Sequence, residues 1–367
     1  MSKVIDFVKK EAVLCVSAVL AVVSMFFVPP SAGYAEYIDF HTLSLLMCLM
    51  TVMVGLRKIG VFSVLTGKLI SMAPTLRRMV FVLVMLCFFF SMAVTNDVAL
   101  ITFVPFAIEA LTKTGHKDKL IYVIVLQTIA ANLGSMLTPI GNPQNLYLYS
   151  LSGMGAVSFI QLMMPYTVVS LVLTLVCIMF VKSEKVSVPE GGSDKVKVRD
   201  TVFYLVMFAL SLLAVANVLP YWIVLIAVVV MAFVFDKKVL IDVDYSLLLT
   251  FVFFFVFIGN MGNIEWFSTF VSNAVSGSEV LVSVLASQVI SNVPAALLLS
   301  GFTERFDLLV VGTNLGGLGT IIASMASLIS YKYFAQTNGN KMKYLGVFTV
   351  MNVAFLIILY GTYIILK

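Results

Sequence analysis

Long apolar segments separated by short polar connections run along almost the whole chain. Most of them approach or exceed the roughly 20 residues that an α-helix needs to cross a hydrocarbon core of about 30 Å. The pattern predicts membrane-spanning helices over residues 12–28, 39–56, 119–149, 158–181, 201–218, 220–235, 245–262, 306–331 and 344–366.

Two of these segments contain glycine, asparagine or proline in their interiors. Residues 132–142 read NLGSMLTPIGN, and residues 314–324 read NLGGLGTIIAS. Such residues interrupt a helix, and the freed backbone groups are tolerated only where protein or a water-filled cavity covers them. Paired breaks in corresponding positions are the best sequence indication of a transporter binding site. We therefore predict a secondary transporter.

Two further apolar segments, 79–112 and 280–302, carry polar dipeptides at their centres, Thr95-Asn96 and Ser291-Asn292. We predict helical hairpins with these dipeptides at the tips. Residues 280–290 would form only about 16 Å of helix, too short to cross, so the second hairpin should be re-entrant. The first arm of the other hairpin is longer, so two full spans are the alternative there.

The distribution of lysine and arginine predicts the orientation in the cell membrane. With the N-terminus in the cytoplasm, 21 of the 23 basic residues fall in cytoplasmic connections, and only Arg305 and Lys367 do not. The first apolar segment is followed by small residues at 31–35, which resembles a signal-peptide cleavage site. We predict a retained first span, with a cleaved signal as the alternative.

The two halves of the chain correspond in order. Gly55 matches Gly259, the hairpin tips match each other, and the breaks match at an offset of 314 − 132 = 182 with five identities in eleven positions. The predicted spans run in opposite directions, so we predict an all-α polytopic fold with two inverted-topology repeats. The expected division is 1–38 (first helix and external loop), 39–181 (repeat 1), 182–200 (cytoplasmic linker), 201–244 (connecting helices) and 245–367 (repeat 2).

Composition excludes an ordinary soluble domain. The 367 residues are 61% hydrophobic and 11% charged, against about 25% charged in soluble proteins. The net charge of +5 follows from the cytoplasmic connections, so we expect no nucleic-acid partner. The four cysteines and two histidines are isolated, which argues against disulfides and zinc. A G-x-x-x-x-G-K motif is absent, so this chain should not hydrolyse ATP.

Tips and breaks that meet near the membrane midplane would bring several helix ends together. Helix N-termini favour an anion, whereas helix C-termini and unwound carbonyls favour a cation such as sodium. We expect a binding site without catalytic groups, formed by Thr95, Asn96, Asp97, Asn132, Thr138, Asn142, Ser291, Asn292, Thr313, Asn314 and Thr320, with Gly134, Gly141, Gly316 and Gly319 allowing close approach of the backbone. The candidate sodium ligands are Asn96, Asn142, Asn292 and Asn314. Helix packing by small polar residues is the alternative.

Asp97 is the one acidic residue at the centre of an apolar segment, and Val293 occupies the matching position. An ionisable group at that depth is costly and suggests a function. Asp97 could coordinate a cation, carry a proton or repel an anion. Capping of the following helix is the alternative. A membrane enzyme is not favoured, because only this one acid lies deep. A passive channel is not favoured either, and single-channel currents would reveal one.

The motifs Thr95-Asn-Asp97, Thr138-Pro-Ile-Gly-Asn-Pro-Gln-Asn145, Ser291-Asn-Val-Pro294 and Asn314-Leu-Gly-Gly317 resemble the citrate-transporter-like and arsenite-permease-like branch of the ion transporter superfamily. The resemblance implies a dimeric scaffold, here 1–78 and 201–279, and a domain that moves like an elevator, here 79–181 and 280–367. It implies transport of a small anion, such as citrate, a dicarboxylate or an oxyanion, coupled to sodium or protons without another cofactor. Arsenite efflux and sodium/proton antiport are the alternatives, because similar dicarboxylate carriers have Ser-Asn-Thr at both tips.

Overall fold

The computed structural model describes residues 11–186 and 196–367, and helices dominate that part of the chain. The first half contains α2 (Ala12–Met25), α3 (Tyr34–Tyr37), α4 (Phe40–Lys58), α5 (Val61–Ser71), α6 (Leu76–Val94), α7 (Asn96–Lys113), η1 (Lys117–Lys119), α8 (Leu120–Ser135), α9 (Pro143–Ser152) and α10 (Ala156–Met179). The second half contains α11 (Val198–Val215), α12 (Tyr221–Asp236), α13 (Lys238–Ile241), α14 (Tyr245–Gly262), α15 (Glu265–Val275), α16 (Glu279–Ile290), α17 (Asn292–Ser300), α18 (Phe306–Gly316), α19 (Met325–Ala335) and α20 (Lys341–Leu366).

Length and apolar composition identify a polytopic membrane protein. Within the described residues, six helices are long and apolar enough to cross a membrane, namely α4, α6, α10, α11, α14 and α20. The interruptions expected within 119–149 and 306–331 are present, because α8 ends at Ser135 before α9, and α18 ends at Gly316 before α19. Both breaks begin a few residues later than the asparagines that we took as their starts, since Asn132 and Asn314 lie in the last helical turns.

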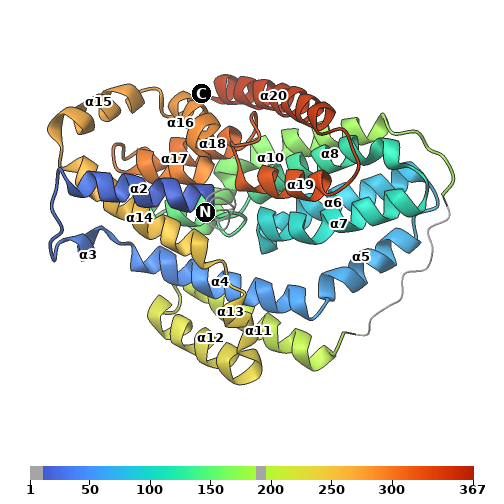
Figure 1. Ribbon diagram of the computed structural model, residues 1–367, viewed down its shortest axis with the longest axis horizontal. Coiled ribbons are helices and arrows are strands. Elements are labelled where there is room, and N and C mark those ends of the chain that lie inside the picture. Colours follow the sequence, from blue (N-terminus) through green and yellow to red (C-terminus); the bar gives the residue numbers. More distant parts are fainter. Residues whose placement is uncertain (1–10, 187–195) are drawn as a thin grey trace, which may run out of the picture.

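The helices form two connected groups (Figure 1). Along the lower side of the view, α4 packs against α11 and α12. Above them, α6, α7, α8, α10, α19 and α20 lie together, and α14 runs beside α2. The α2–α14 contact includes a polar junction, where Nδ2 of Asn260 lies 2.9 Å from Oγ of Ser24 and 2.8 Å from the Tyr34 hydroxyl.

Each broken helix sends its second segment into the other half of the molecule. The first segment α8 packs against α6 and α7, whereas its continuation α9 packs against α17 and α18. In the same way α18 packs against α16 and α17, whereas its continuation α19 packs against α7 and α8. The two breaks are therefore crossing points between the halves.

Two segments that we treat as connections contain helices, α5 within 57–78 and α15 within 263–279. Both are 11 residues long, which is too short for either helix alone to cross a membrane. Trp266 and Phe270 on α15 are each 68% exposed, and α15 meets α16 at an angle of 113°. Of the linker 182–200, residues 187–195 lie outside the described part, as do the N-terminal Lys3, Lys9 and Lys10 used for the orientation.

Candidate functional site

The two hairpin tips have the same unusual backbone. Thr95 has φ 75° and ψ 150°, and Ser291 has φ 73° and ψ 156°. Positive φ in a non-glycine residue costs on the order of 1–3 kcal/mol and persists only where surrounding structure imposes it. Main-chain hydrogen bonds hold the next residue of each tip. The backbone N–H of Asn96 donates to the Gly141 carbonyl at 3.0 Å, and the backbone N–H of Asn292 donates to the Ala323 carbonyl at 2.9 Å.

A second pair of matching bonds ties each hairpin to its break. The Thr138 hydroxyl donates to the carbonyl oxygen of Met92. The Thr320 hydroxyl donates to the carbonyl oxygen of Gln288 at 3.2 Å. Each hairpin is therefore fastened to the loop of its own half by two equivalent bonds, one from the main chain and one from a threonine.

Asparagine side chains join the two breaks to each other. Asn142, which caps the start of α9, donates to Oδ1 of Asn314 at 3.2 Å. Ser324, at the start of α19, donates to Oδ1 of Asn132 at 3.1 Å, and Asn96 from the first tip donates to the same oxygen at 3.0 Å. All five side chains are at most 4% exposed. The result is a buried polar network, free of lysine and arginine, at the starts of α7, α9 and α19 and the ends of α8 and α18.

Asn292 at the second tip differs from its counterpart Asn96. It is only 4% exposed, yet within the described residues its side chain makes no hydrogen bond, whereas that of Asn96 is bonded to Asn132. The oxygen that would be equivalent, Oδ1 of Asn314, already accepts from Asn142. Asn292 therefore leaves a buried amide available for a ligand.

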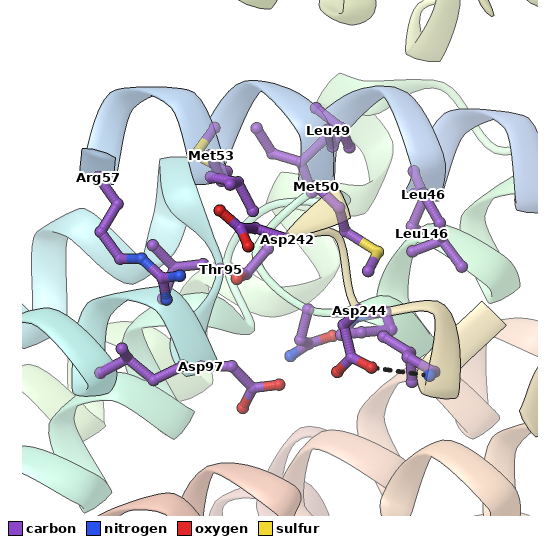
Figure 2. Close-up of a pocket in the computed structure, with 17 residues that line it drawn as sticks. Leu46, Leu49, Met50, Met53, Arg57, Thr95, Asp97, Leu146, Asp242 and Asp244 are labelled. Carbon is purple, nitrogen blue, oxygen red and sulfur yellow. Dashed lines mark hydrogen bonds between the residues drawn. The ribbon is translucent and has the colours of Figure 1, made fainter. Parts of the chain in front are cut away.

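A cavity of about 130 Å³ opens beside the network (Figure 2). Apolar side chains of α4 form one wall, and its polar lining is Arg57, Thr95, Asp97, Asn142, Asp242 and Asp244. The buried Oδ1 of Asp97 accepts no hydrogen bond within the described part of the chain. Asp97 also lies in the first turn of α7, where a carboxylate interacts favourably with the helix dipole, so the capping alternative stays open beside ligand binding.

Three of the expected glycines lie where a helix or turn approaches very closely. A Cβ at Gly134 would lie 1.9 Å from the Phe88 carbonyl oxygen, and one at Gly141 would lie 2.0 Å from the Ser135 carbonyl oxygen. A Cβ at Gly316 would lie 2.5 Å from the Ser287 hydroxyl oxygen. The fourth glycine, Gly319, has a φ of +108°. These glycines bring α6 against α8, close the first break, and bring α16 against α18.

Not every expected residue joins the network. Thr313 is buried, but its hydroxyl donates at 2.7 Å to the Leu309 carbonyl of its own helix. Thr320 is exposed. Sequence reasoning also missed three polar side chains that structure the breaks, Asn145, Ser324 and Gln288. Asn145 and Ser324 end motifs that we noted, whereas Gln288 lies outside all of those motifs.

Within the described residues, no cluster of three or more histidine, cysteine, aspartate or glutamate side chains could hold a metal ion. Any cation bound here would therefore rest on amide, hydroxyl and main-chain oxygens with at most one or two carboxylates. Such oxygen ligands suit a hard cation such as sodium or magnesium better than a transition metal.

Comparison with known proteins agrees with this geometry. A family model described as citrate transporter matches residues 3–304. The chain is 35% identical to an uncharacterized transporter from Methanocaldococcus jannaschii over 72% of both proteins. It is also 31% identical to the inner membrane protein YbiR from Escherichia coli, over 84% of this chain and 83% of that protein. Interrupted helices, a polar network at their crossing and these relatives together identify the chain as a secondary transporter of the citrate transporter family.

Proposed function

We propose that this transporter moves a small anion, a carboxylate or an oxyanion, across the plasma membrane together with sodium or protons. The observation that carries the proposal is the buried asparagine network, where the starts of α7, α9 and α19 meet the ends of α8 and α18. Helix N-termini present free N–H groups and partial positive charge, so they attract an anion without a buried lysine or arginine. Side-chain amides can recognise the substrate without the cost of burying a lysine or arginine in the network.

Matching hydrogen bonds support the inverted repeats as part of this proposal. The bonds Asn96–Gly141 and Thr138–Met92 in one half have the counterparts Asn292–Ala323 and Thr320–Gln288 in the other. We infer that 79–181 and 280–367 move as one unit, since the network joins their hairpins and breaks. The scaffold, 1–78 and 201–279, would pair with a second copy of the chain, and the coupling ion would be the sole cofactor.

The substitution Asn292→Ala tests the site most sharply. The substitution should abolish uptake, because it removes the amide that is available for the substrate. It should leave thermal stability nearly unchanged, because the Asn292 side chain makes no hydrogen bond within the described residues. The matched control is Asn338→Ala, because Asn338 is an exposed loop asparagine. Uptake of radiolabelled citrate, succinate, phosphate and arsenite into proteoliposomes is measured with and without sodium and pH gradients. Normal uptake by Asn292→Ala, or wild-type uptake that ignores both gradients, would contradict the proposal.

Asp97 favours a second candidate, cation/proton exchange or arsenite extrusion. The cavity places Asp97 with Asp242 and Asp244 and only one arginine, an excess of negative charge that attracts cations (Figure 2). In that case Asp97→Asn removes the pH dependence of flux, whereas Asp118→Asn, a change in an exposed connection, preserves it. Identical pH profiles for wild type and Asp97→Asn would exclude proton transfer by this carboxylate.

A further inference from the structure

Each break encloses a side-chain amide among main-chain carbonyl oxygens. In the first, Nδ2 of Asn145 lies 3.4, 3.5 and 3.2 Å from the carbonyl oxygens of Ser135, Met136 and Thr138. In the second, Nε2 of Gln288 lies 3.0 Å from the Gly316 oxygen and 2.8 Å from the Leu318 oxygen, with the Val284 oxygen of its own helix at 3.2 Å.

The two amides come from different places in the two halves. The offset of 182 that aligns the breaks puts Ser327 at the position of Asn145. The offset between the tips, 292 − 96 = 196, puts Met92 at the position of Gln288. One half therefore supplies its amide from the broken helix, and the other supplies it from the hairpin. Both halves therefore place an amide donor among the carbonyl oxygens of the break, although different residues provide it.

The reason for a donor lies in how a helix ends. The last carbonyls of a helix have no partner within it and need a hydrogen-bond donor, water or a cation. The C-terminal ends of interrupted membrane helices are thus places where sodium is commonly held. The NH₂ group of Gln288 carries two partially positive hydrogens and donates to these oxygens, so it occupies the position that a cation would take.

The second loop is shaped around this side chain. Oε1 of Gln288 accepts from the Thr320 amide at 2.8 Å, so the glutamine bonds the loop on both sides. Gly319 has φ +108°, and a Cβ there would lie 2.3 Å from the same Oε1. The bonds at 2.8 and 3.0 Å are also shorter than the three to Asn145, so the second amide holds its oxygens more closely.

We propose that Gln288 is a positioning residue whose amide takes the place of a coupling cation at the second break. The inference rests on the proposed ion-coupled transport and adds that the two halves are unequal in cation binding. The carbonyls of Gly316 and Leu318 are engaged by the chain itself, so a coupling cation is bound elsewhere in the site.

The test removes the donor and asks whether sodium replaces it. Gln288→Met installs the residue found at the matching position in the first half, and Gln288→Glu keeps the shape but removes the N–H donors. Thermal unfolding of the purified full chain is followed at pH 8 in sodium chloride and in choline chloride of equal concentration. The matched control is Gln127→Met, because Nε2 of Gln127 also donates to two carbonyls, at 3.3 Å each, but away from both breaks.

We expect both Gln288 variants to unfold at a lower temperature in choline, and sodium to restore at least half of that loss. Both the loss of unfolding temperature in choline and its recovery in sodium should be larger for Gln288→Glu. Its carboxylate repels the surrounding carbonyl oxygens unless a cation lies between them. Gln127→Met should lose the same stability in either salt. A sodium shift in both Gln288 variants no larger than in wild type would overturn the inference. The measurement needs no substrate, so failure of anion uptake and failure of this inference are seen separately.

Discussion

Gly134→Ala adds one methyl group where α6 and α8 touch. The new Cβ would lie 1.9 Å from the Phe88 carbonyl oxygen and 2.7 Å from the Ser91 hydroxyl. Real Cβ contacts stay above 3.0 Å, so the two helices would have to separate by about 1.1 Å along this contact. A flexible side chain cannot absorb this displacement, because the nearest atom belongs to the backbone of α6.

The energy of this change follows from two opposing effects. Overpacking of a tight contact costs about 3 kcal/mol when backbone has to move. Alanine is a better helix former than glycine and returns up to about 1 kcal/mol. The net loss is about 2 kcal/mol, which in a chain of this length corresponds to a fall in unfolding temperature of roughly 2–4 °C. Gly134 lies in the last turn of α8, directly before the first break, so transport should fall with it.

The assay is thermal unfolding of the purified protein together with uptake in proteoliposomes. Gly346→Ala is the matched control, since a Cβ at this helical glycine of α20 would meet no atom within 4 Å. That variant should be as stable as wild type or slightly more stable, with normal uptake. Equal stability of Gly134→Ala and Gly346→Ala would refute the close approach of α6 and α8.

Two further predictions concern stability. Asn260→Leu removes the donor to Ser24 and Tyr34, so it should lower the free energy of unfolding by about 1–3 kcal/mol and increase proteolysis of the α2 region; unchanged protection of α2 would contradict this. The bond from Lys119 lowers the pKa of Asp118, so this pair stabilises the fold above the carboxyl's unfolded pKa, and that contribution is lost as the pH falls through the folded value. Because both groups are largely exposed, Asp118→Asn should cost less than about 0.5 kcal/mol at pH 7 and nothing in acid, as thermal unfolding across pH would reveal.

The positions of the long helices could be predicted from the sequence, because each long apolar run corresponds to a helix. The start of α4 at Asp39 and that of α14 at Asp244 show the same local signal, a carboxylate that accepts from the amide three residues on. The connecting helices α5 and α15 were not predicted. Each has only 11 residues, which is too short for the pattern of a membrane span.

The residues of the site could be predicted from the sequence only in part. Asparagine and glycine in an apolar environment marked Asn132, Asn142 and Asn314, since such residues need a reason to be buried. Asn145 was in a motif that we noted, but its partners lie in the break itself and on α18. Gln288 could not have been identified, because its partners lie 28 and 30 residues away and no periodicity connects them.

Sequence patterns alone predict a set of membrane helices, two of them interrupted, with polar tips between apolar arms. These are local properties, set by hydropathy over about 20 residues and by residues that cannot continue a helix. The packing of α9 and α19 in the opposite halves, which brings Asn142 to Asn314 and Ser324 to Asn132, is visible only in the folded molecule. Such pairings depend on which helix faces meet, and burial satisfies a polar group only when its partner arrives from another part of the chain.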